Sequence, residues 1–181
     1  MSKQNSYLNY VQLLSKVDEW FDAMFRRHEK HFSCARGCFG CCKSGLSVLP
    51  VEADYIKYWV KKNPEVEQKL KSSELMGSNP AFCEFIDHDG GCSIYEARPI
   101  ICRSHGTPVS FLDDATGSER RDVCPLNFRG TDIESLAASD LLSLDKVNTL
   151  LSLINRQFLQ SNEVERVSLS RVFKEITTEC E

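Results

Sequence analysis

The distribution of cysteines is the feature of this sequence that most constrains its fold. Nine cysteines occur in the chain, and eight of them lie between residues 34 and 124, whereas only Cys180 lies outside that segment. An odd total argues against a complete set of disulfides. Metal ligation is therefore the main explanation for the clustering, and the alternative is a scatter of buried cysteines that act as small apolar side chains.

The N-terminal segment, the charge and the length indicate where a protein with such a cluster would be located and which partners it would lack. The N-terminal segment is amphipathic and lacks the apolar core of a secretory signal, and no stretch approaches the roughly 20 apolar residues that span a bilayer. We therefore expect a cytoplasmic protein with no membrane partner, in a compartment where structural disulfides are uncommon. The net charge of −4 also argues against a nucleic-acid partner. A length of 181 residues favours a single domain, 1–181.

The N-terminal half outside the cysteines is predicted to be helical. Between Tyr7 and Phe25 the apolar residues recur at steps of three and four, which is typical of one long amphipathic helix. Pro50 is predicted to open a helix of roughly 14 residues. The segment Asn63-Pro64-Glu65 repeats that signal for a shorter helix that runs toward Met76.

The C-terminal third is also predicted to be helical. Thr131 and Glu134 have the spacing of a capping box, and apolar residues follow it at near-helical steps as far as Phe158. A shorter helix is predicted over 169–176. Residues 1–32 and 131–180 are thus expected to form helical flanks around a cysteine-cluster metal-binding core at 34–124.

The first part of that core is a loop with the pattern Cys34-x3-Cys38-x2-Cys41-Cys42. Its glycines allow a tight turn on which several sulfurs can converge. Thiolates are soft donors that hold zinc tetrahedrally or bind iron in clusters. Because neighbouring side chains tend to point apart, Cys41 and Cys42 are predicted to serve different metal ions, or different corners of one cluster.

The second part contains Cys83, Cys92 and Cys102, and Cys124 follows later. Two short runs, 82–86 and 92–95, flank an Asp- and Gly-rich turn and predict a small β-hairpin. Residues 99–102 are expected to form a helical turn, and 106–125 an irregular loop with at most one more strand. The eight sulfurs suffice for two four-cysteine sites, or for one cluster with cysteines left over. Cys180 is expected to be a free thiol.

Together these segments predict a mainly α-helical fold that encloses a small irregular α+β metal knuckle with a short β-hairpin. His105, three residues after Cys102, is a further candidate ligand or general base. No dinucleotide-binding or phosphate-binding glycine motif accompanies the cysteines, and no nucleophile elbow is present. Any chemistry must therefore be carried by the cysteine site.

Two segments resemble the YkgJ-like bacterial cysteine-cluster proteins, a group described as zinc- or iron-chelating domains. Residues 34–42 resemble the opening C-x-x-C-x-x-C-C of that family, although here three residues separate Cys34 from Cys38. Residues 91–103, GCSIYEARPIICR, are similar to its segment G-C-x-I-Y-x-x-R-P-x-x-C-R. The resemblance implies the following ligands: Cys38, Cys41, Cys42, Cys92 and Cys102. It implies less for Cys83 and Cys124.

Three functions are consistent with these observations. The first is a metal-binding protein that holds zinc or iron through its clustered thiolates, and whose partner is the metal ion. The second is an iron–sulfur oxidoreductase or electron carrier, a label often given to this family. The third is a thiol-based redox sensor. Arg98 and Arg103 are interpreted as cations that neutralise an anionic thiolate site, because four thiolates on Zn²⁺ leave a net charge near −2.

Overall fold

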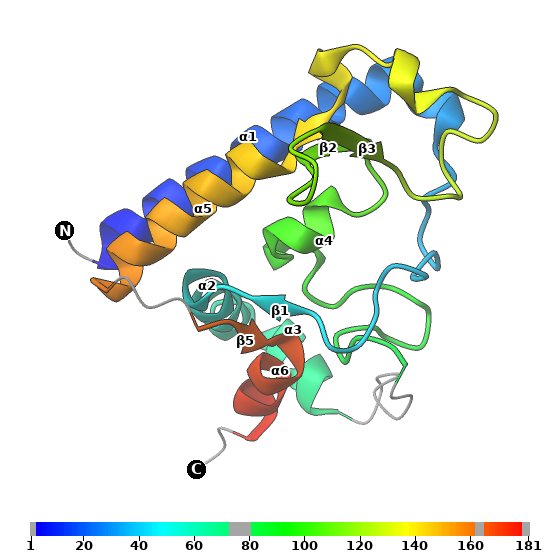
Figure 1. Ribbon diagram of the computed structural model, residues 1–181. Helices are drawn as coiled ribbons and strands as arrows, with labels where there is room; N and C mark the ends of the chain where they lie inside the picture. Colours follow the sequence, from blue (N-terminus) through cyan, green and yellow to red (C-terminus); the bar gives the residue numbers. More distant parts are fainter. Residues whose placement is uncertain (1–2, 73–80, 162–164, 179–181) are drawn as a thin grey trace.

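The computed structural model describes residues 3–72, 81–161 and 165–178. Helices dominate it (Figure 1): α1 Lys3–His28, α2 Pro50–Lys61, α3 Pro64–Lys71, α4 Ile100–Ser104, α5 Leu144–Leu159 and α6 Leu169–Thr178. Strands β1 Ser47–Val48 and β5 Val167–Ser168 pair in one small sheet, and β3 Glu119–Asp122, β2 Val109–Leu112 and β4 Leu142–Ser143 form another. The predicted fold class, mainly α with a small cysteine-bearing α+β region, is confirmed. None of the helices described here has the length and apolarity that a membrane span requires.

Helices α1 and α5 lie side by side and antiparallel along one side of the molecule (Figure 1). Asn9 near the start of α1 donates to Gln157 near the end of α5 at 3.1 Å. Trp20 donates to the carbonyl of Ser139, ahead of α5, at 2.9 Å. The apolar faces of both helices pack in one core cluster. Because α1 buries one face, its apolar residues recur with the helical period that predicted it from the sequence.

A second apolar cluster lies under α2, α3 and α6 and reaches the cysteine-bearing loops. Glu52 connects this region to α4. Its carboxylate, only 2% exposed, accepts the backbone N–H of Leu49 at 2.9 Å and that of Ile100 at 3.0 Å, so one side chain caps the first turns of both α2 and α4. These two hydrogen bonds fix the position of α4, the short helix that carries Cys102.

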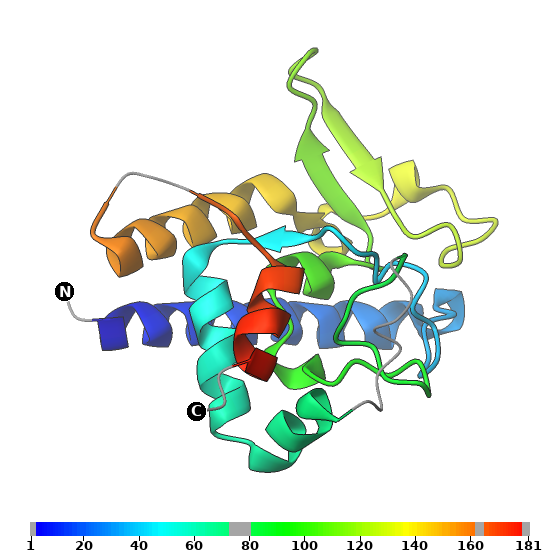
Figure 2. The same cartoon turned by 90° about the horizontal axis from the view of Figure 1, so that it is seen from below.

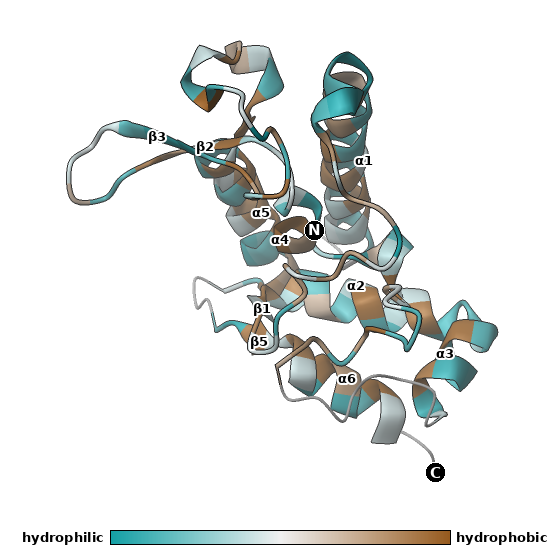
Figure 3. Ribbon diagram, turned by 90° about the vertical axis from the view of Figure 1, so that its right-hand side faces the viewer, coloured by the Kyte–Doolittle hydropathy of each residue, from teal (hydrophilic) through white to brown (hydrophobic). Residues whose placement is uncertain are grey.

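The predicted hairpin at 82–95 is wrong in extent, because its two runs are joined by an isolated bridge between Ile86 and Cys92 rather than by paired strands, while Phe82 bridges to Lys43. The hairpin of the structure is β2–β3, within the segment predicted to be irregular, and it projects from the body of the molecule (Figure 2). Its second strand, Glu119–Asp122, is entirely polar, whereas β2 is more hydrophobic (Figure 3). A strand without apolar residues gives no alternating pattern from which it could be predicted.

The capping box predicted at Thr131 is also wrong. Asp132 caps a 3₁₀ turn there, Ile133–Ser135, by accepting the N–H of Glu134 at 3.0 Å. A second 3₁₀ turn and β4 follow before α5 begins at Leu144. The helices predicted from Pro50 and over 169–176 are confirmed as α2 and α6, and the helical turn at 99–102 as α4. The predicted extension of the α3 helix to Met76 lies outside the described residues.

Candidate metal centre

A cavity of about 750 Å³ lies between the second half of α1, the loop that follows it and the segment leading to α4. Seven of the eight predicted ligands line it: Cys34, Cys38, Cys41, Cys42, Cys83, Cys92 and Cys102. His105 lines it as well, whereas Cys124 is absent from its wall. Cys180 lies outside the described residues. The long-range packing therefore brings both sequence groups of cysteines to one place.

Four cysteines, Cys42, Cys83, Cys92 and Cys102, belong to the second apolar cluster, and we call them the inner group. The backbone N–H of Cys83 donates to the carbonyl of Cys42 at 3.0 Å, which joins the two sequence segments. Burial raises the pKa of Cys83 to about 11 and that of Cys102 to about 12, and the neighbouring thiolates add to both shifts. Burial also raises the pKa of Cys92. These thiols resist ionisation until a cation compensates the charge.

The other four, Cys34, Cys38, Cys41 and Cys124, belong to neither apolar cluster, and we call them the outer group. Cys34 is exposed and the rest are partly exposed. Burial is the main cause that raises the pKa of the Cys34 thiol, and repulsion from the thiolates of Cys38, Cys124 and Cys41 raises it further. The four sulfurs are thus close enough for their charges to interact.

The adjacent pair Cys41 and Cys42 lies where the two groups meet. The Cys42 thiol donates a hydrogen bond to the sulfur of Cys41, which lowers the pKa of Cys41 to about 6 and raises that of Cys42 well above its usual value. The charge of His105 also lowers the pKa of Cys41. Cys42 packs against the second apolar cluster and Cys41 does not, although the hydrogen bond holds their two sulfurs close together.

Asn127 organises the outer group, and nothing in the sequence pattern indicated it. Its side chain is 2% exposed and accepts the N–H of Ser33 at 2.8 Å. Its amide donates to the carbonyl of Gly106 at 2.7 Å and to the sulfur of Cys34 at 3.2 Å. Its own backbone N–H donates to the carbonyl of Cys124 at 2.8 Å. One residue therefore joins three segments that surround the outer cysteines.

Two glycines permit the close packing of these loops. At Gly106, where φ is +90°, a Cβ would lie 3.2 Å from the sulfur of Cys34. At Gly90, where φ is +74°, a Cβ would lie 2.8 Å from the ring of Phe39 and 2.9 Å from the Cα of Gly37. Both positions combine a left-handed backbone with a close approach, which only glycine tolerates without strain.

The two arginines assigned to the site differ in their surroundings. Arg103, 8% exposed, donates to the carboxylate of Asp18 on α1 and to the carbonyls of Arg98 at 2.9 Å and Glu96 at 2.7 Å. Its charge is thus balanced by an acid. Arg98 has no acidic partner among the described residues, and its charge lowers the pKa of Cys92. Of the two, Arg98 is the arginine whose charge no acid balances within the described segments.

The donor set agrees with zinc or iron, because seven soft sulfur ligands line one cavity and an eighth, Cys124, is close enough to Cys34 for their charges to interact. As the side chains stand, however, no three Cys, His, Asp or Glu residues of the described segments converge closely enough to hold one ion. Closure of a site would require rotation of the cysteine side chains, a movement that the cavity leaves room for.

Comparison with known proteins gives one match. No curated protein and no solved structure matches the chain. The family model "CxxCxxCC: Putative zinc- or iron-chelating domain" matches residues 33–125, which cover slightly more than half of the chain and contain all eight clustered cysteines. Metal binding is the property that this family describes. The chain therefore belongs to the CxxCxxCC family of zinc- or iron-chelating domains.

Proposed function

We propose that this protein holds zinc or iron through its eight clustered cysteines, divided into the inner and outer groups. The observation that carries the proposal is the cavity whose wall contains seven of these cysteines. The division follows from packing, because Cys83 belongs to the second apolar cluster and the other inner cysteines pack against it, whereas the outer four do not. It assigns the adjacent Cys41 and Cys42 to different groups.

The residues of the chain have distinct parts in this proposal. The inner thiolates would carry a net negative charge in apolar surroundings when they hold a divalent ion. Asn127 fixes the sulfur of Cys34 by its amide N–H. Bound zinc would cross-link the loops, whereas a bound iron–sulfur cluster would add one-electron chemistry. In the reducing cytoplasm, where we place the protein, the thiols would stay available as ligands.

Elemental analysis of protein purified without oxygen tests the proposal. We expect stoichiometric zinc or iron in the full chain. Cys42→Ser and Cys102→Ser should remove metal from the inner group, and Cys34→Ser and Cys41→Ser from the outer group. Cys180→Ser, which changes the cysteine outside the cluster, should retain the full content. Unchanged metal content in both Cys41→Ser and Cys42→Ser would contradict the proposal.

An iron–sulfur oxidoreductase or electron carrier is the alternative that surplus thiolates favour. It predicts iron with sulfide and broad absorbance near roughly 400 nm. A colourless protein with stoichiometric zinc and no redox signal would eliminate it.

A thiol-based redox sensor is favoured by a different observation, the hydrogen-bonded pair of Cys41 and Cys42 with its lowered pKa at Cys41. A thiolate at neutral pH is the reactive form of cysteine. Thiol titration before and after chelator and oxidant treatment tests this role. An unchanged number of free thiols would exclude it.

A further inference from the structure

Four side chains that are cationic at neutral pH line the cavity, and three of them are paired with acids. Lys69 and Arg36 both reach the buried carboxylate of Asp87, at 2.6 and 3.8 Å. Arg103 pairs with Asp18. Arg98 is the exception in the described part of the chain, because no carboxylate lies within ion-pair distance of it. Its charge is therefore available to a group that enters the cavity.

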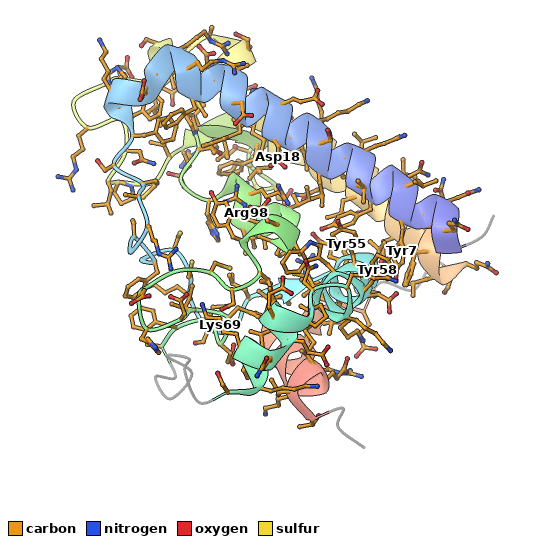
Figure 4. The ribbon with its side chains drawn as sticks, turned by 180° about the vertical axis from the view of Figure 1, so that it is seen from behind. Tyr7, Asp18, Tyr55, Tyr58, Lys69 and Arg98 are labelled. Carbon is orange, nitrogen blue, oxygen red and sulfur yellow. The ribbon has the colours of Figure 1, made fainter. Side chains whose placement is uncertain are left out.

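Arg98 and a second residue of the cavity wall also have unused hydrogen-bonding groups in the described part of the chain. The Nε of Arg98 is buried and has no hydrogen-bond partner within the described residues, and the same is true of the hydroxyl of Ser93, which lines the same cavity. The Arg98 guanidinium stacks on the ring of Tyr95, with its central carbon 3.9 Å from the ring centroid. Figure 4 shows Arg98 beside α4, facing the space between α1 and the cysteine-bearing loops. The stacking on Tyr95 fixes the orientation of the Arg98 guanidinium. Because a buried donor without an acceptor is costly, Arg98 Nε and the Ser93 hydroxyl are each suited to bind an acceptor that enters the cavity.

Another part of the cavity wall is apolar. Phe21 and Phe25 of α1 and Phe32 of the following loop line it, with ring centroids 5.7 Å apart for the first pair and 5.1 Å apart for the second. A volume of about 750 Å³ is larger than metal ions bound by thiolates require and lies within the range of small-molecule sites. Cationic donors and an aromatic wall in one cavity are complementary to a ligand that has an anionic head and an apolar body.

We propose that this cavity binds a small organic anion, a carboxylate or a phosphate monoester with a ring-sized apolar body. Arg98 and Ser93 hold the anionic oxygens, since a guanidinium fork matches carboxylate and phosphate geometry. The three phenylalanines hold the apolar body. The inference builds on the proposed function in one respect, because it places the anion beside the metal-binding thiolates that share the cavity.

The competing role for Arg98 is charge compensation of the inner group through Cys92. The two roles differ in what a substitution changes. An anchor for a ligand can be replaced without loss of metal, whereas a cation that supports the thiolates cannot.

The test uses the full chain as purified, with sodium benzoate and phenyl phosphate as probes and benzyl alcohol as the neutral analogue, measured by isothermal titration. We expect saturable binding of at least one anion and binding at least about tenfold weaker for benzyl alcohol. Arg98→Gln should weaken anion binding by about tenfold to a hundredfold, because a charge-assisted hydrogen bond is lost, while the metal content stays unchanged. Arg120→Gln, at an exposed position of the β2–β3 hairpin, is the matched control and should bind like the natural chain.

Absence of saturable anion binding in the natural chain would overturn the inference, and so would an unchanged affinity in Arg98→Gln. Loss of metal in Arg98→Gln without anion binding in the natural chain would assign Arg98 to Cys92 instead. If Arg98→Gln fails to fold, Ser93→Ala and the comparison of benzoate with benzyl alcohol decide the question on their own. Elemental analysis of the same preparations reports separately on the proposed function, so failure of one proposal is distinguishable from failure of the other.

Discussion

Replacement of Asn127 by alanine is expected to destabilise the protein, because this buried side chain joins three segments of the chain. The side chain of Asn127 is 2% exposed and supplies an acceptor to Ser33 and donors to Gly106 and Cys34. Alanine would leave a backbone N–H and a backbone carbonyl without partners. It would also leave a cavity in place of the amide.

The size of the effect follows from these contacts. Each hydrogen bond contributes about 1 kcal/mol net, and a buried group that loses its partner costs about 1–3 kcal/mol. Gly106 is partly buried, whereas Ser33 is exposed and its N–H can bind water instead. The two backbone partners and a weaker contact with sulfur therefore give a loss of about 2–4 kcal/mol in the free energy of unfolding. For a chain of this length that loss corresponds to a decrease in Tm of roughly 5–15 °C.

The measurement is thermal and urea denaturation of reduced, metal-free protein, followed by elemental analysis after metal loading. Asn148→Ala, which makes the same chemical change at an exposed site on α5, is the control and should change stability by less than about 0.5 kcal/mol. Asn127→Asp should be at least as harmful, because it removes both donors and places a carboxylate beside a carbonyl and a sulfur. If Asn127→Ala unfolds within about 1 °C of the natural chain, the proposed role of this residue in joining the three segments is incorrect.

Two further changes test other parts of the cavity. Burial opposes ionisation of Asp87, but hydrogen bonds from Lys69 and from a backbone N–H outweigh it and lower the pKa of this carboxyl group. The ionised carboxylate therefore stabilises the fold at pH values above its usual titration range, and this stabilisation is lost as pH falls through the lowered pKa. Asp87→Asn should therefore cost about 1–2 kcal/mol at neutral pH, and denaturation curves should show this difference shrinking below about pH 4. Gly106→Ala should cost about 1–2 kcal/mol in backbone strain and should also reduce metal retention, because its Cβ meets the sulfur of Cys34. Gly117 is the control, because it has a φ of +67° but nothing lies within 4 Å of an added Cβ. Gly117→Ala should therefore lose stability and keep its metal, and equal metal loss in both variants would refute the steric explanation.

The helices were predictable where an apolar stripe and a start signal coincide. The stripe of α1 and the Pro50 start of α2 reflect burial of one helix face and a proline at the first helical position, and both are local properties. The β2–β3 hairpin and the start of α5 were not predictable in this way. The all-polar β3 has no pattern, and the turns after Asp132 are set by packing against α1, to which Asp140 is held by Arg27 and His28.

The candidate site was predictable in its composition but not in its arrangement. The spacing around Cys41 and Cys42 indicated thiolate ligands, whereas the hydrogen bond between their sulfurs could not be predicted from two neighbouring positions. Which cysteines share a group depends on contacts between segments far apart in the chain, such as that of Cys83 with Cys42. The role of Asn127 arises from a buried amide that meets three loops, and no spacing rule encodes such a contact.

The junction of the inner and outer groups at Cys41 and Cys42 has a consequence for metal loading. The thiol of Cys42 donates a hydrogen bond to the sulfur of Cys41, so one proton lies between the two groups. Under the proposed function, a metal ion that binds the Cys42 thiolate displaces this proton and leaves the sulfur of Cys41 without its donor. Metal uptake by the two groups would then be linked through a single proton.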